Sequence, residues 1–406
     1  MTVEATERER AERVQSALGK PAVAAATAVP VERSGRMLGI DMARALALIG
    51  MVAVHVGPED GPGLGGRLYA LAYGRASLLF VLVAGIGVTL LASRVGTAAA
   101  RLRLVCFCLV LLPMGLALQV IGHPIAIILH HYAAFFLVGV AVLNLSSRFL
   151  FVLALAVTLL GPLTYFLAML YDPEIYYGDS VTLLDDPLTI LRALVISGPY
   201  PIVVWSVPLL WGMWIGRQDL RERRTHIRLG YVGALLAAGA MGLSLLLLSI
   251  TGDPVRSTDW RMLLIHAAHS QMPLWLLSGI GAAMFVLGLS LLFASRFPRA
   301  ARPFALLGQV ALSMYVAHVL LLSLLVRHLD QDAVVPSLVL LALLTAGAMG
   351  FAVIWRKFHA RGPVEMLMHL LPGLMDRTLA GPSPTQEPVV RSSRDQRTVG
   401  AGPPDR

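Results

Sequence analysis

An acid, a base and an imidazole share one apolar segment near the start of the chain. Asp41, Arg44 and His55 lie within the stretch 37–56, which is long enough to cross a bilayer. Ionisable groups inside hydrocarbon are energetically costly, so they mark candidate functional positions. Arg44 and His55 are eleven residues apart, or about three helical turns, and Asp41 lies nearly on the same face. We therefore predict one polar stripe on a helix, with Arg44 and His55 about 16 Å apart.

This stripe combines groups suited to acid–base chemistry and to anion binding. A neutral imidazole such as that of His55 acts as a general base at ordinary pH. The guanidinium of Arg44 binds phosphate oxygens with two donors. Two plainer interpretations stay open. Asp41 and Arg44 could merely neutralise each other at the helix entrance, and His55 could be an interfacial histidine at a helix end, where polar groups are tolerated.

A second group of polar side chains interrupts the apolar stretch 68–92. It contains Arg75 and Ser77, with Arg75 about two turns from its start. A cation at that depth, which is similar to the depth of His55, would stabilise a developing oxyanion or bind an anionic group. The alternative is an arginine that snorkels to the membrane interface.

Further candidates lie in later apolar stretches. His130 and His131 point about 100° apart on a helix, so they cannot easily chelate one metal ion, and we favour a structural or pore-lining role. Tyr200 lies between two prolines, where irregular backbone within membranes lines cavities. Tyr315 and His318 share a helix face. Both need partners in hydrocarbon, so they should face the bundle interior.

The composition requires a membrane. The chain has 406 residues, of which 57% are hydrophobic and 14% are charged, and its mean hydropathy is +0.73. This balance excludes an ordinary soluble domain, and the long apolar runs lack the alternation of spanning β-barrels. We predict an all-α polytopic bundle of about ten transmembrane helices, at 37–56, 68–92, 103–121, 124–144, 149–170, 195–216, 229–250, 273–294, 304–326 and 335–356.

Arginines gather in alternate loops between these stretches. By the positive-inside rule both termini are cytoplasmic, and the acidic loop from Asp172 to Asp186 is external. The same rule explains the net charge of +9 without a nucleic-acid partner. His266 and His269 fall in an external loop, where histidines are usually solvated. Residues 1–35 and 371–406 are interpreted as mostly disordered cytoplasmic tails around a membrane domain at 36–370.

Nucleotide and metal motifs are missing from the sequence. No Walker, Rossmann, zinc or nucleophile-elbow pattern occurs. Cys106 and Cys108 lie at positions i and i+2 of an apolar segment, so they should point to different sides, without a disulfide or a metal ion. The protein is therefore expected to be neither nucleotide-driven nor metal-dependent.

Several motifs resemble those of known membrane-protein families. Arg44 followed after ten residues by His55, and the segment from Ser313 to His318, resemble motifs of the acyltransferase-3 family. Over roughly residues 36–370 the order of motifs is more similar to the YeiB-like bacterial membrane proteins and to the bacterial relatives of heparan-alpha-glucosaminide N-acetyltransferase. The motifs that carry this similarity are Ile-Asp-Met-Ala-Arg-Ala at 40–45, Gly-Arg-Ala-Ser-Leu-Leu-Phe at 74–80, Gly-Pro-Tyr-Pro at 198–201 and Gly-Pro-Val-Glu at 362–365.

The resemblance implies an enzyme of the inner (plasma) membrane that moves an acyl group from cytoplasmic acetyl-CoA, or another acyl-CoA, to a hydroxyl or amine of a sugar or lipid across the bilayer. It implies that His55 is the catalytic base and that Arg44 lies on the CoA side. In the heparan-modifying relatives the catalytic histidine lies in the loop after the first span, so the resemblance leaves open which histidine is the base.

From these residues we expect the following roles. Arg75 would steady the oxyanion, and Tyr315 or His318 would orient the acceptor. Acceptor contacts are also expected from Ser77, Tyr200 and His269, and contacts to the CoA diphosphate from Arg101 and Arg103. The alternative function is a transporter or flippase for a small polar or lipid-linked solute. In that case the buried ionisable groups would form a proton relay or substrate path through Asp41, Arg44, His130 and His318.

Overall fold

A computed structural model describes residues 36–57, 72–122, 125–325 and 334–379. The expected tail at 1–35 lies outside the described residues, as do residues 380–406 of the expected tail at 371–406. Everything described from Leu38 onward belongs to one compact unit. Its described residues form helices and connecting segments, without a strand. The prediction of an all-α fold is confirmed.

Seven described helices are long and apolar enough to cross a membrane. A helix with this composition buries few polar groups in hydrocarbon and satisfies its backbone hydrogen bonds internally. The seven helices are α2 (Leu38–Val56), α4 (Arg75–Val95), α5 (Thr97–Gln119), α7 (Ser147–Tyr171), α10 (Arg223–Thr251), α11 (Pro273–Arg296) and α14 (Val334–Phe358).

Two of the ten expected spans are bent. The number of candidate spans among the described residues rises to nine if each bent pair counts as one. The first pair joins α8 (Pro187–Arg192) and η2 (Ala193–Ser197) to α9 (Ile202–Ile215), with a bend of 61°. The second joins α12 (Pro298–Gln309) to α13 (Ala311–Leu325), with a bend of 67°.

The remaining elements are short. α6 (Leu129–Val142) occupies most of the expected span 124–144 but has only 14 residues, too few for a full crossing. Short connecting helices are η1 (Pro173–Tyr177) and η3 (Trp260–Leu264). The chain continues into α15 (Pro363–Met368) and α16 (Leu370–Leu379). Helical structure therefore extends past the expected boundary at residue 370.

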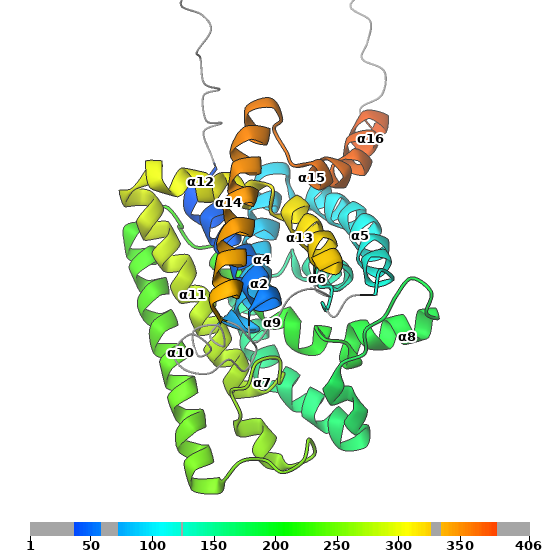
Figure 1. The fold of residues 1–406 in the computed structure, drawn as a ribbon, viewed down its shortest axis with the longest axis vertical. Coiled ribbons are helices and arrows are strands. Elements are labelled where there is room, and N and C mark those ends of the chain that lie inside the picture. Colours follow the sequence, from blue (N-terminus) through cyan, green and yellow to red (C-terminus); the bar gives the residue numbers. More distant parts are fainter. Residues whose placement is uncertain (1–35, 58–71, 123–124, 326–333, 380–406) are drawn as a thin grey trace, which may run out of the picture. The chain divides into compact units, whose positions relative to one another are not determined.

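α2 is the central helix of the bundle. It packs against α4, α11, α12, α13 and α14, and 67% of its apolar window is buried. α10 and α14 are peripheral, with only 17% and 11% of their windows buried. Figure 1 shows α10 running alongside α11, its main neighbour. Because the outward faces of α10 and α14 are apolar, these helices face lipid.

Two glycines allow α4 and α9 to cross closely. A Cβ atom at Gly85 of α4 would collide with the backbone carbonyl of Leu209 in α9, and one at Gly212 of α9 would collide with the carbonyl of Leu82. Small residues allow helix backbones to approach in this way inside membranes. Gly85 and Gly212 therefore serve helix packing.

Candidate functional site

The beginning of α2 carries the predicted acid–base pair. Arg44 Nη1 donates to Asp41 Oδ1 at 3.1 Å, so the two side chains share a face as the spacing predicts. Gln309 Nε2 of α12 donates to Asp41 Oδ2 at 3.0 Å. The Asp41 carboxylate is buried, whereas the Arg44 side chain is 27% exposed. A Cβ atom at Gly308 would collide with the backbone carbonyl of Asp41, which explains how closely α12 approaches α2.

His55, at the other end of α2, meets a histidine from α13. His55 Nδ1 and His318 Nε2 are 3.2 Å apart, and the two rings are stacked with centroids 5.4 Å apart and planes within 5° of parallel. The edge of the Tyr315 ring packs against His318, with centroids 5.0 Å apart. The prediction that Tyr315 and His318 share a face is confirmed. The pair of imidazoles joins residues 263 positions apart in the chain.

Tyr315 connects this imidazole pair to the start of α6. The backbone N–H of Ile128 donates to Tyr315 Oη at 3.2 Å, one residue before α6 begins. Tyr132, one turn into α6, interacts electrostatically with Arg44, Tyr315 and Tyr200. Arg44 and the three tyrosines therefore lie in one region of the bundle, although their positions span most of the sequence.

Glu365 of α15 fixes the direction of α13. Its Oε1 accepts hydrogen bonds from the backbone N–H groups of Leu312, at 2.8 Å, and Ser313, at 3.2 Å. Its Oε2 accepts from the Ser313 hydroxyl, and Ser313 Oγ accepts in turn from the Val364 N–H at 2.9 Å. A carboxylate bound to the first N–H groups of a helix also complements the helix dipole.

The bend between α12 and α13 follows from this cap. The N–H groups at 312 and 313 bond to Glu365 rather than to carbonyls of α12, so the helix restarts at Ala311. The span expected at 304–326 therefore consists of two helices that meet at a bend of 67°. Glu365 ends the Gly-Pro-Val-Glu motif, but the sequence alone does not predict it as a site residue.

Arg75 occupies a different position from the one predicted. It is the first residue of α4 rather than a residue two turns inside a span, because Gly74 adopts a positive φ of 67° and begins the helix there. Arg75 lies near His266. The pKa of His266 is lowered mainly by burial and further by the positive charge of Arg75. His266 Nδ1 is 3.0 Å from Ser244 Oγ of α10. The contacts described for Arg75 place it beside His266.

The second bent pair contains an aromatic cluster around Tyr200. The Tyr200 ring makes edge contacts with Trp205 and His269, with centroids 4.7 and 5.5 Å apart. The Ser77 hydroxyl of α4 interacts with the Tyr200 phenol. The structure thus brings together the three predicted acceptor contacts Ser77, Tyr200 and His269. The irregular backbone expected at the prolines is confirmed by the break between η2 and α9.

His269 is half-buried and packs against aromatic rings, so the expectation from the sequence that this loop histidine is solvated is wrong. Its ring stacks on Trp205, with centroids 5.7 Å apart, and burial lowers its pKa to about 4. His269 and Gln271 have φ values of 56° and 64°, a conformation that non-glycine residues rarely adopt. Gln271 accepts from Trp205 Nε1 at 2.8 Å and donates to the Pro199 carbonyl at 3.2 Å, which holds the loop in place.

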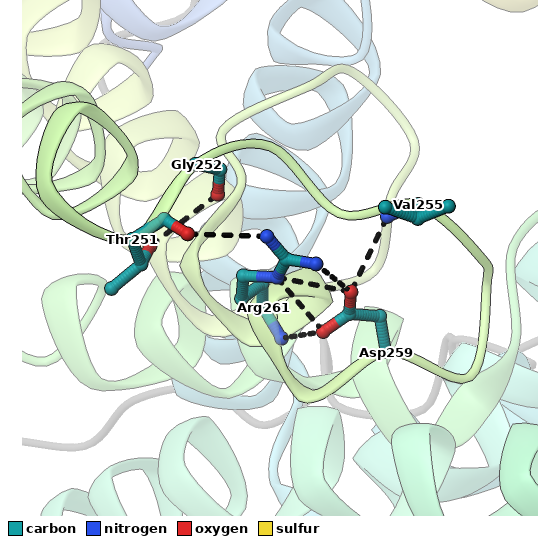
Figure 2. Close-up of polar contacts among 5 residues, drawn as sticks. All are labelled: Thr251, Gly252, Val255, Asp259 and Arg261. Atoms are coloured by element: carbon teal, nitrogen blue, oxygen red, sulfur yellow. Dashed lines mark hydrogen bonds and ion pairs between the residues drawn. The ribbon is translucent and has the colours of Figure 1, made fainter.

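The same loop is anchored at its start by an ion pair. Arg261 Nη2 donates to Asp259 Oδ2 at 2.6 Å and Nη1 donates to the Thr251 carbonyl at 3.1 Å (Figure 2). Hydrogen bonds from the Arg261 guanidinium hold the pKa of Asp259 well below its usual range. The Val255 N–H donates to the same carboxylate. These bonds link the end of α10 to η3, from which the chain leads to His266 and His269.

Buried polar atoms gather where α6 meets η2. His130 and His131 are buried, with their ring centroids 4.2 Å apart. Among the described residues, neither ring nitrogen of His130 has a hydrogen-bond partner, nor do Tyr132 Oη and Ser197 Oγ. Buried polar groups are almost always satisfied, so these atoms mark a place for ordered water or for a polar group of a ligand.

The predicted CoA contacts lie near the beginning of α5. Arg101 Nε donates to the Val140 carbonyl at 3.2 Å. Arg103 and Arg361 both lie near His369, whose pKa is lowered to about 4 by burial and then by these two arginines. Since α2 and α4 run in opposite directions, the beginnings of α2 and α5 lie at the same end of the bundle. Arg44, Arg101 and Arg103 therefore lie toward one end, and His55 lies toward the other.

The two cysteines are separate, as the sequence predicts. Both side chains are buried, and no disulfide joins the two residues. Cys108 Sγ contacts the Ala133 carbonyl, and Cys106 Sγ contacts Met375. They face different helices, so α5 uses them for packing.

Comparison with known proteins adds a family match over part of the chain. Residues 215–372 match the model of a family described as "Protein of unknown function (DUF418)". The match runs from the end of α9 through α15 and includes His318 and Glu365, but it leaves out α2 and His55. No curated protein matches the chain. Over this segment the chain is similar to a YeiB-like family of membrane proteins whose function is unknown.

Proposed function

We propose that this protein is an integral membrane acyltransferase. It takes an acyl group from acetyl-CoA or another acyl-CoA and transfers it to a hydroxyl or amine of a sugar or lipid across the bilayer. The observation that carries the proposal is the contact between His55 Nδ1 and His318 Nε2 at 3.2 Å. Two paired imidazoles inside a membrane bundle are costly to bury, and they are suited to moving a proton.

The pair gives each histidine a separate role. In the required tautomer His55 Nδ1–H donates to His318 Nε2, so His55 Nε2 carries the lone pair that acts as the base. When His55 Nε2 takes the proton of the acceptor, the charge that forms is shared through this hydrogen bond with His318. His318 is thus a positioning residue, with the role that an orienting partner has in a nucleophile–base arrangement.

The transfer step balances without a metal or an oxidant. The acceptor oxygen or nitrogen attacks the thioester carbonyl while its proton moves to His55 Nε2. A C–O or C–N bond forms, the C–S bond breaks, and the proton on His55 passes to the leaving thiolate of CoA. General-base catalysis by a positioned histidine contributes about 10²–10⁴ in rate.

The two ends of α2 separate donor binding from chemistry. Arg44 and His55 are eleven residues apart, a span of about 16 Å along a helix, which suits the narrow pantetheine arm of CoA. Positive charge for the CoA diphosphate at the Arg44 end comes from three arginines, Arg101, Arg103 and Arg361. The distribution of loop arginines supports placing this end, and both termini, on the cytoplasmic side of the plasma membrane.

Acceptor contacts come from the tyrosines near the imidazole pair. Tyr315 packs on His318. Tyr132 interacts electrostatically with both Tyr315 and Tyr200, so Tyr200 lies in the same region of the bundle. Ser77 and His269 both contact Tyr200. The unsatisfied atoms of His130, Tyr132 and Ser197 provide further hydrogen-bonding capacity for a polar acceptor group. Arg75 is the proposed oxyanion partner, and its neighbour is His266.

The first test is acetyl-CoA binding to the purified protein, measured by calorimetry and by thermal shift. We expect micromolar binding by the wild type and at least tenfold weaker binding by Arg44→Ala and Arg103→Ala. Arg148→Ala, which removes an exposed arginine at the start of α7, is the matched control and should bind as the wild type does. A folded wild type that does not bind acetyl-CoA would contradict the proposal and favour a transporter.

The second test separates binding from transfer. Membranes that contain the wild type or His55→Ala are incubated with isotopically labelled acetyl-CoA, and labelled lipids and glycans are extracted and counted. His55→Ala should bind acetyl-CoA normally and lose transfer. Equal labelling by both proteins would show that the His55 pair is not the reacting centre.

A further inference from the structure

A groove on the surface of the bundle is lined by His318, the partner of His55 in the imidazole pair. It has a volume of about 560 Å³, within the range of small-molecule sites, and it lies between α13 and α14 with α2 along one side. Figure 1 shows α14 passing in front of α2, and α13 as a separate helix to the right of α14. The polar side chains among its lining residues are Ser313, His318 and Thr345.

The rest of the lining is apolar. α2 contributes Leu48, Ile49 and Val52, and the facing walls are formed mainly by leucine, alanine, glycine, valine and phenylalanine residues of α13 and α14. A water-soluble sugar gains nothing from such walls, whereas a hydrocarbon chain packs against them without exposing apolar surface to water. The lining therefore favours an alkyl chain as the occupant.

The position of the groove also favours a lipid. α14 has the smallest buried share of the seven candidate spans, so the groove that it borders opens toward the bilayer. His55 is the penultimate residue of α2, whereas Val52 and Leu48 lie about one and two turns deeper along the helix. The reactive pair is thus at the interfacial end, and the apolar lining continues toward the bilayer centre. Bilayer lipids have the same orientation, with the head group outward and the chain inward.

We propose that this groove holds the hydrocarbon chain of a lipid acceptor, whose hydroxyl or amine lies at His318 and His55. The assignment of this lipid as the acceptor rests on the proposed acyltransferase function. The chain enters from the bilayer between α13 and α14, and the head group reaches the imidazole pair without leaving the membrane interface. The acceptor loses its O–H or N–H proton to His55 and gains the acyl group, while CoA leaves as the thiol.

Photocrosslinking tests the groove directly. The full-length protein is reconstituted with a phosphatidylethanolamine that carries a diazirine in its acyl chain and an amine in its head group. After illumination, labelled peptides are mapped by mass spectrometry. We expect labelling to concentrate on the parts of α13 and α14 that line the groove, around Met314 and Leu344.

Two substitutions on one helix provide a matched pair. Ala348 lines the groove, whereas Ala346 is exposed and is not among the lining residues. Ala348→Phe should reduce labelling of the groove at least fivefold, and Ala346→Phe should leave it unchanged. Ala317→Phe, which fills the groove from α13, is a second blocking variant in case one substitution disturbs folding. Each variant is required to bind acetyl-CoA as the wild type does.

The outcomes separate this inference from the proposed function. Labelling spread evenly over α7, α10 and α14, or unchanged in both blocking variants, would overturn the groove assignment. Acyl transfer to a water-soluble acceptor, without labelling of the groove, would overturn the lipid acceptor and leave the acyltransferase intact. Labelling of the groove in a protein that neither binds acetyl-CoA nor transfers acyl groups would overturn both the acyltransferase and the acceptor role.

Discussion

His55 and His318 stack with their ring planes within 5° of parallel and with ring nitrogens 3.2 Å apart, although they belong to different helices. His55→Ala removes the proposed base and should lower kcat at least about 100-fold, the lower bound for general-base catalysis. His318→Gln keeps a hydrogen-bonding side chain and should lower kcat about tenfold, with KM unchanged, because it alters the orientation of His55.

These two constants are measured with labelled acetyl-CoA in proteoliposomes. His359→Gln, which changes an exposed histidine, is the control and should leave both constants unchanged. A larger effect of His318→Gln than of His55→Ala on kcat would reverse the roles assigned to the two histidines.

The Glu365 cap should be required for a well-ordered α13. Glu365→Ala leaves the N–H groups of Leu312 and Ser313 without their acceptor, at a cost of about 1–3 kcal/mol for buried groups. Hydrogen exchange in the peptide 311–318 should accelerate, and the Tm should fall. Glu365→Gln keeps an acceptor oxygen, so its Tm and its exchange rate at 311–318 should lie between those of the wild type and the alanine variant.

Glu222→Ala is the matched acidic control for this experiment. Glu222 precedes α10 but its side chain makes no capping hydrogen bond there. Its removal should leave hydrogen exchange in both helices unchanged. Unaltered exchange at 311–318 in Glu365→Ala would show that the carboxylate does not hold α13.

The glycine contact between α4 and α9 should tolerate no side chain. Gly85→Ala and Gly212→Ala force backbones apart and should each destabilise the protein by about 1–3 kcal/mol or more, as overpacking does. Gly239→Ala in α10 is the control, because its Cβ would meet open space and alanine favours a helix by about 1 kcal/mol. Thermal unfolding in detergent measures all three; equal Tm values would contradict the close crossing.

We predict that His269 makes the folded protein less stable at mildly acidic pH. Burial lowers its pKa to about 4, compared with about 6.5 in an unfolded chain. Between these values the unfolded chain binds a proton that the folded protein does not, so stability falls as the pH decreases from about 6.5 toward 4. Above about pH 6.5 the effect is absent, because the histidine is neutral in both states.

His269→Gln should therefore reduce the decrease in Tm between pH 7 and pH 4.5. The side chains around His269 are the uncharged Tyr200, Trp205 and Trp275, so no neighbouring ring supplies a compensating negative charge. His359→Gln, which changes an exposed histidine, should leave the pH dependence of Tm unchanged. Identical curves for the wild type and His269→Gln would show that this histidine does not contribute.

Local periodicity was sufficient to predict contacts within one helix. The Asp41–Arg44 pair and the shared face of Tyr315 and His318 follow from spacings of three residues, which the helix geometry fixes. The apolar runs likewise predicted most candidate spans, because length and hydropathy decide whether a helix can cross a bilayer.

Contacts between distant helices could not be predicted in this way. Nothing local pairs His55 with His318, because that contact depends on where α2 and α13 meet. The bend at Val310 has no proline or glycine at the break, and its cause is a carboxylate 55 positions later. The polar residues around His269 are typical of a surface loop and predict a solvated histidine, yet its ring stacks on Trp205, which Gln271 holds by a hydrogen bond.

Because the direction of α13 depends on Glu365, this helix can reach its final position only late in synthesis. During synthesis His318 emerges from the ribosome before Glu365, and α14 separates the two residues in the chain. Until Glu365 has been translated, the first N–H groups of α13 lack the carboxylate that sets the direction of this helix. A nascent chain that stops before residue 362 contains both histidines but lacks the carboxylate that directs one toward the other, so the two histidines pair only after α14 has been inserted.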